Sequence, residues 1–196
     1  IPAHWLPNRW GQDWGALVEV EGVDVDAALA EKDPEWVVRS GEDFYVSLGF
    51  PPLPETFWER SDLYPLPEDA GYKKNNNASA WHIGQSDDVR SLMSVVPDTR
   101  WYGTAHHELG HVYYYIHYTR PEVPPILRFG TNRAMHEAIG SMMGMASLQL
   151  PYLRGRGMVA EDVEVDEVQL LLREALDHVV FMPWGGGVMP AFERSV

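Results

Sequence analysis

The clearest repeating pattern of apolar residues lies between positions 101 and 118. Apolar side chains recur there at spacings of three and four residues, as on the buried side of an α-helix, at Leu109, Val112 and Ile116. Thr104 could cap the start of such a helix, and Pro121 marks where it must end. We therefore predict one partly buried helix over 101–118.

Similar patterns predict further elements on both sides of this helix. Residues 61–77 are polar, as in a loop, and a short hairpin follows, with strands at 78–81 and 90–96 around a turn at 84–88. Other helices are expected at 35–49, 55–60, 132–148 and 161–181. The predicted fold class is mainly α, a multi-helix fold with a small β-hairpin next to the helix at 101–118.

Three of these predicted helices have a recognisable apolar side. In the helix at 35–49 the apolar side comprises Val37, Val38, Phe44 and Leu48. The helix at 132–148 is rich in Gly, Ala and Met, so we expect it to be buried. In the last helix the expected inward residues are Val165, Val168, Leu171, Leu172, Ala175, Val179 and Val180.

Composition limits the class of protein. Hydrophobic residues make up 45% of the 196, which is typical of a chain that folds around a core. The net charge of −14 argues against nucleic acid or an anionic membrane as a partner. The chain lacks an apolar run long enough to span a membrane. It also has no Cys, which excludes disulfides and cysteine-ligated metals.

The predicted helix at 101–118 carries the sequence His-Glu-x-x-His at 107–111. Residues four apart on a helix lie about 40° apart around its axis, so His107 and His111 can direct two imidazoles at one zinc ion. Glu108 lies beside them and could take a proton from a water that the zinc activates. Buried polar side chains need partners, and a metal ion would supply one for this set.

A catalytic zinc usually has three protein ligands and one open position, so a third ligand must come from elsewhere in the chain. His136 and Glu137 begin the next predicted helix, which one loop could bring over the first. Neighbouring positions on a helix point about 100° apart, so one of the two faces the metal. Spacing favours Glu137 and leaves His136 as the alternative.

Five segments in collinear order, which together span nearly the whole chain, resemble the angiotensin-converting enzyme family of zinc dipeptidyl carboxypeptidases. They are Ile1-Pro2-Ala3-His4 with Trp10-Gly11-Gln12, Ser47-Leu48-Gly49 with Phe57-Trp58, Ala78-Ser79-Ala80-Trp81, His106 to His111, and His136 to Gly140. The resemblance implies the zincin-type metallopeptidase core of a gluzincin, in which the third zinc ligand is a Glu. It therefore selects Glu137.

The resemblance also implies roles for individual residues. His107, His111 and Glu137 would bind zinc, and Glu108 would act first as general base and then as general acid. The substrate backbone would bind as an added strand along Ala78, Ser79 and Ala80. Gln12 would help to hold the C-terminal carboxylate of the substrate. Zinc is the implied cofactor, one ion per site, and chloride is a second candidate.

This chain departs from the family pattern at three positions near the implied site. Asn77 stands where the family has a His before the substrate strand, and Asn76 stands where it has a Cys. Ser141 stands where the family has an Asp that orients the first zinc His. Losing such an orienting partner commonly costs about 10–100-fold in metal affinity or activity.

We therefore predict a zinc metallopeptidase that releases dipeptides from the C-terminus of short peptides. The alternative is a zinc-binding but inactive homologue or fragment that acts as a binding module. Family members are about three times longer, so residues 1–196 are expected to be the catalytic zinc-binding portion of a larger peptidase domain, truncated at both ends. The expected partners are short peptides and the remainder of the same polypeptide, and the resemblance favours a secreted or periplasmic location.

Overall fold

The computed structural model describes residues 14–21 and 23–196. These residues form two compact units. The first runs from Val25 to Met158, and the second consists of the described residues before Val25 together with Val159–Val196. The residues of the predicted metal site that the structure describes all belong to the first unit. In the described part of the chain, none of the helices is long and apolar enough to cross a membrane.

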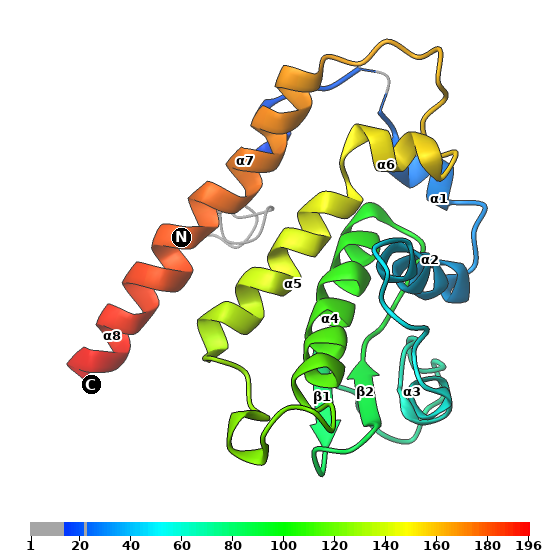
Figure 1. Ribbon diagram of the computed structural model, residues 1–196. Helices are drawn as coiled ribbons and strands as arrows, with labels where there is room; N and C mark the ends of the chain where they lie inside the picture. Colours follow the sequence, from blue (N-terminus) through cyan, green and yellow to red (C-terminus); the bar gives the residue numbers. More distant parts are fainter. Residues whose placement is uncertain (1–13, 22) are drawn as a thin grey trace. The chain divides into compact units, whose positions relative to one another are not determined.

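The first unit is mainly helical and contains one antiparallel hairpin, which confirms the predicted fold class (Figure 1). Its helices are α1 (Val25–Leu29), α2 (Pro34–Ser47), α3 (Glu55–Arg60), α4 (Thr99–Tyr118), α5 (Arg133–Ser147) and α6 (Leu150–Gly155), with a 3₁₀ turn at Pro125–Leu127. Its strands are β1 (Ser79–Ile83) and β2 (Asp88–Leu92). The sequence patterns missed α6, because the Pro at its second position was taken as the end of the preceding helix.

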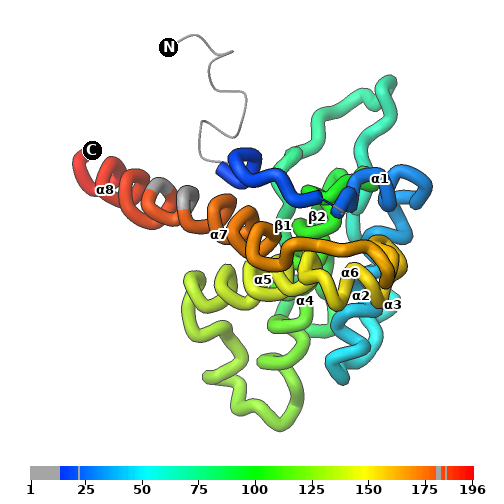
Figure 2. The backbone as a smooth tube through the Cα atoms, turned by 90° about the horizontal axis from the view of Figure 1, so that it is seen from above, coloured from blue at the N-terminus to red at the C-terminus, as the bar shows by residue number. Residues whose placement is uncertain are grey.

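Helix α4 is the central element of this unit. It lies between α5 and α2 in both views and also packs against both strands of the hairpin (Figure 1 and Figure 2). Its side towards α2 is buried, and Tyr45 of α2 stacks on Tyr113 and donates a hydrogen bond to the carbonyl of His106 at 2.8 Å. Of the predicted apolar stripes, Leu109, Val112, Val37, Val38 and Phe44 are buried, whereas Leu48 is exposed.

Helix α4 begins two residues earlier than predicted, and its cap is a different residue. The carboxylate of Asp98 accepts a hydrogen bond from the backbone N–H of Trp101 at 2.6 Å, as an N-cap does. Thr104 therefore lies within the helix, and its proposed capping role was wrong. An Asp directly after a Pro and before the helical run is the stronger cap signal, because its side chain can accept from the orphan N–H groups of the first turn.

The hairpin forms where it was predicted, but its strands are shifted from the predicted 78–81 and 90–96. Ser79 pairs with Leu92 and Ile83 with Asp88, and the chain reverses through Gly84 and Gln85, which both have positive φ. The segment before the hairpin also joins it, since Asp62 forms a parallel bridge to Leu92. This bridge covers the outer edge of β2, whereas β1 is the other edge of the sheet.

Helices α4 and α5 approach each other through glycines. A Cβ atom at Gly110 would lie 2.9 Å from the Cα of Gly140 and 2.9 Å from the hydroxyl of Tyr45. The small residues of α5 therefore face α4, as expected of a buried stripe. The opposite side of α5 is not covered within this unit, and Met142 is 52% exposed, so the predicted burial of the whole helix was wrong.

The helix crossing yields a stability prediction. Gly110→Ala should lower the free energy of unfolding by about 1–3 kcal/mol, because the added methyl group meets backbone atoms that cannot rotate away. Urea denaturation measures the change. Gly155→Ala is the matched control, since a Cβ there has no neighbour within 4 Å and Ala favours the helix. Equal stability of the Gly110→Ala variant and the unmodified protein would contradict the close approach.

The second unit contains helix α7 (Glu167–Pro183), a π-helical turn (Trp184–Val188), helix α8 (Met189–Ser195) and the 3₁₀ turn Gly15–Leu17. Helix α7 begins six residues later than predicted, and among its described side chains Leu170 is the buried one, at 2% exposure. The predicted inward residues Val168, Leu171, Leu172 and Val179 are exposed, and the side chain of Val180 is outside the described part. Within its unit α7 packs on the three-residue turn Gly15–Leu17, which is too short to cover a whole apolar face.

Candidate metal centre

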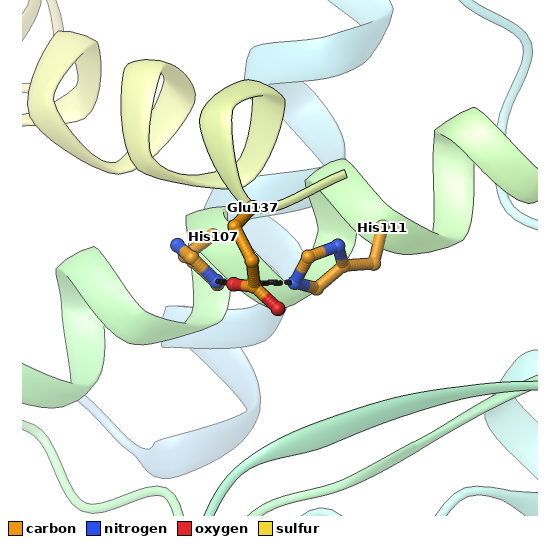
Figure 3. A group of neighbouring side chains, drawn as sticks. All are labelled: His107, His111 and Glu137. Carbon is orange, nitrogen blue, oxygen red and sulfur yellow. Dashed lines mark hydrogen bonds and ion pairs between the residues drawn. The ribbon is translucent and has the colours of Figure 1, made fainter. Parts of the chain in front are cut away.

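Three side chains predicted as zinc ligands converge between α4 and α5 (Figure 3). His107 and His111 point to the same side of α4, and their Nε2 atoms are 3.1 Å apart. Glu137 extends from the first turns of α5, and its Oε2 lies 3.3 Å from Nε2 of His107 and 3.5 Å from Nε2 of His111. The three atoms therefore form a nearly equilateral triangle.

The size of this triangle fits a zinc ion. Tetrahedral zinc binds His nitrogen and carboxylate oxygen at about 2.0–2.2 Å, so neighbouring ligand atoms lie roughly 3.3–3.5 Å apart. The separations here are 3.1, 3.3 and 3.5 Å. A hydrogen bond can join two of these atoms, but one proton cannot bond to all three. A metal ion can bind all three at once. Donor types and geometry thus both match a two-His, one-Glu zinc site.

Gly140 allows α5 to approach the first ligand closely. A Cβ at this position would lie 2.9 Å from the carbonyl oxygen of His107 and 3.0 Å from two atoms of its ring. Any larger residue would displace either the helix or the imidazole. The glycine of the His136–Gly140 segment therefore positions His107 relative to Glu137, which lies one turn earlier on the same helix.

Glu108 is buried next to the ligands. Its side chain is 6% exposed, and its Oε2 has no hydrogen-bond partner among the described residues. Burial, together with the charge of Glu137, raises the pKa of Glu108 to about 7. A buried carboxyl oxygen without a partner is costly in a purely structural role, so its position at the cavity favours a chemical one.

His106, the neighbour of the first predicted ligand on α4, lies in a different environment from the ligands. His106 is fully buried on the side towards α2, where its Nδ1 donates to the carbonyl of Tyr102 at 2.7 Å and Phe44 packs edge-on. Burial lowers the pKa of His106 to about 4, so the ring is neutral. Burial also lowers the pKa of His111, which keeps its ring neutral and able to bind a metal. His106 is therefore part of the core.

His136, the alternative third ligand, lies on the other side of His111. Its Nδ1 is 3.0 Å from Nδ1 of His111, the ring nitrogen that faces away from His107. Glu137 is therefore the member of the His136–Glu137 pair that reaches the converging Nε2 atoms. Burial lowers the pKa of His136, as it does for His111.

The three converging side chains, His107, His111 and Glu137, line a cavity of about 720 Å³. The predicted substrate residues Ala78, Ser79 and Ala80 line the same cavity, together with Glu108. The hydroxyl of Tyr115 on α4 donates to the carbonyl of Ala80 at 3.3 Å, which connects the strand to the helix that carries the ligands. A peptide lying along β1 would therefore pass beside the converging side chains.

The structure does not bear on every predicted site residue. Gln12 lies outside the described residues. Asn76 and Asn77 are exposed immediately before β1, and Ser141 is half-buried one turn after Glu137. Tyr115 and Tyr118, which were not among the predicted site residues, also line the cavity. Their positions four and seven residues after His111 put them on the ligand side of α4, a signal that helical periodicity could have supplied.

A helix bearing His-Glu-x-x-His, a carboxylate from the following helix and an adjoining cleft are together typical of the zinc peptidase class. Comparison with known proteins gives the particular family: a family model described as angiotensin-converting enzyme, of the peptidase class, matches residues 1–189. The chain belongs to the angiotensin-converting enzyme family of peptidases, as its five matching segments predicted.

Individual relatives agree with this assignment. The chain is 32% identical to an angiotensin-converting enzyme-related protein of Drosophila melanogaster over 96% of its own length, which is 31% of that relative. It is 30% identical to the angiotensin-converting enzyme of Haematobia irritans exigua, with 94% of the chain and 31% of the relative covered. It is also 35% identical to the enzyme of Sus scrofa, with 94% of the chain and 15% of the relative covered. The chain thus spans less than a third of each relative.

Proposed function

We propose that this chain is the zinc-binding catalytic part of a peptidyl-dipeptidase, which cleaves short peptides near the C-terminus and releases dipeptides. The observation that carries the proposal is one shared cavity: the three converging side chains, the buried carboxyl of Glu108 and the open edge of β1 all line it. Family membership supports the peptidase class. The particular cleavage and the role of Glu108 are our inference.

In this proposal His107, His111 and Glu137 hold one zinc ion. Zinc in such a site polarises a peptide carbonyl and lowers the pKa of water towards about 7. Glu108 accepts one proton of the attacking water and donates it to the nitrogen of the leaving amine as the C–N bond breaks. The second proton of that water is released when the new carboxyl group ionises, and it passes to the amine through the same Glu108 carboxyl group. The burial of Glu108 excludes competing water from that carboxyl.

The substrate backbone is proposed to bind along β1. In an antiparallel strand the N–H and C=O of one residue point to the same edge, and residues two apart share it. Because Tyr115 of α4 donates to the carbonyl of Ala80, we assign the main-chain groups of Ala80 and Ala78 to the edge that β2 does not use. That carbonyl can accept a second hydrogen bond, so a peptide can still pair with it.

Two further parts of the proposal rest on the family alone. Gln12 is assigned to the C-terminal carboxylate of the substrate, which would limit cleavage to chain ends, and chloride is assigned as a second ion. A location outside the cytoplasm is proposed on the same basis.

The proposal is tested with a matched pair of short blocked peptides, one with a free C-terminal carboxylate and one with a C-terminal amide. The zinc-loaded protein should release a dipeptide from the first, identified by mass spectrometry, and should cleave the amide far more slowly. Removing zinc with a chelator should stop the reaction, and adding it back should restore it. Zinc binding without cleavage of either peptide would instead favour the inactive binding module.

A further inference from the structure

We propose that His136 is a positioning residue of the metal centre: its imidazole accepts a hydrogen bond from Nδ1 of His111 and so fixes the tautomer and orientation in which His111 binds zinc. The inference rests on the zinc site of the proposed function. It gives His136 a role distinct from that of a ligand, although it lies next to Glu137 in the sequence. The main observation that supports it is the 3.0 Å distance between Nδ1 of His111 and Nδ1 of His136.

The tautomers of both rings follow from this contact. A neutral imidazole has one N–H and one lone pair, and a His that binds a metal through Nε2 must carry its hydrogen on Nδ1. The Nδ1 of His111 is then a donor, and it faces Nδ1 of His136. His136 must therefore present its lone pair at Nδ1 and carry its hydrogen on Nε2. A metal-binding His usually donates its second nitrogen to such an acceptor, which fixes the ring orientation.

The ring of His136 is itself held in place. Tyr114, Tyr115 and Tyr118 of α4 surround it, with ring centroids at 4.6, 4.9 and 5.9 Å. On another side lies Gly130, where a Cβ would be 2.7 Å from the Cδ2 atom of His136. The acceptor nitrogen thus belongs to a ring with little freedom to turn.

One turn of α5 therefore contacts both nitrogens of His111. Glu137 lies 3.5 Å from its Nε2 and His136 lies 3.0 Å from its Nδ1. The side chain of Asn132 caps this turn by accepting from the N–H of Met135 at 2.8 Å, which fixes where the two residues project. Two adjacent residues about 100° apart can enclose one imidazole in this way.

A pair of isosteric variants tests the role. In His136→Asn the amide oxygen can occupy the position of Nδ1 and keep the acceptor, whereas in His136→Gln the amide group lies further out, near the position of Nε2. We expect His136→Asn to retain nearly all zinc affinity and His136→Gln to lose about 10–100-fold, measured by competition with a chromophoric chelator. The visible spectrum of the cobalt-substituted protein should change for His136→Gln and stay nearly unchanged for His136→Asn.

His82→Gln is the matched control, because His82 also lines the cavity and stacks on Tyr115 but bonds to the carbonyl of Ser86 rather than to a ligand. Its zinc affinity should equal that of the unmodified protein. Equal zinc affinity and equal cobalt spectra for the Asn and Gln variants of His136 would overturn the positioning role. Failure of the unmodified protein to bind zinc would instead overturn the proposed metal site.

Discussion

Replacing Glu108 with Gln is expected to lower kcat for peptide cleavage by about 10²–10⁴-fold while zinc stays bound. The amide has nearly the same size as the carboxyl group but cannot accept the proton of the attacking water, and a general base contributes an effect of this order. Because Glu108 is buried beside the ligands and is not one of the three converging groups, its loss should leave the metal site intact. The measurement is kcat on a blocked peptide, with zinc content determined on the same sample.

Glu122→Gln serves as the control for this variant. Glu122 is an exposed carboxyl group in the loop between α4 and α5, so the same change there should leave both kcat and zinc content unaltered. If Glu108→Gln cleaved the peptide as fast as the unmodified protein, Glu108 could not be the base. If it lost zinc together with activity, the loss of activity could no longer be assigned to proton transfer.

The pair of histidines could be predicted from the sequence because its geometry is local. His107 and His111 are four positions apart on one helix, and this spacing determines their relative position whatever packs around the helix. The structure brings their Nε2 atoms to 3.1 Å, as that spacing implies. Their role as zinc ligands stays a prediction until metal binding is measured.

The third member of the site was harder to predict because it depends on two helices. Spacing left both Glu137 and His136 open, and the family resemblance made the choice. What decides between them physically is the rotation of α5 about its axis. Gly140 and Gly110 fix that rotation where the two backbones touch. Gly110 and Gly140 are 30 positions apart, and the apolar pattern of α4 or of α5 alone does not show that they meet.

The incorrect predictions of burial have a common physical cause. Apolar periodicity shows which side of a helix can be buried, but burial needs a second element to cover that side. For α4 the cover is α2, and Leu109 and Val112 are buried as predicted. For α7 the packed segment of its unit is a three-residue turn, and Leu171 stays exposed.

Replacing Glu137 with Ala is expected to abolish most of the stabilisation that zinc gives the fold. A ligand that binds the native state alone stabilises it by about 4 kcal/mol when its free concentration is 1,000 times its Kd, and weaker binding reduces this amount. With Glu137 removed, two imidazoles remain, and a two-His site should bind zinc far more weakly. Thermal unfolding with and without added zinc should therefore show a large rise in Tm for the unmodified protein and little rise for Glu137→Ala.

The same experiment distinguishes the two candidates for the third ligand. If Glu137 binds zinc, His136→Asn should keep nearly the full rise in Tm, because the carboxylate and both imidazoles are still present. If His136 were the ligand instead, Glu137→Ala would keep the rise and His136→Asn would lose it. The second outcome would require the first turn of α5 to rotate by about 100°, and the backbone contact between Gly110 and Gly140 opposes that rotation. The close approach of the two helices therefore favours Glu137.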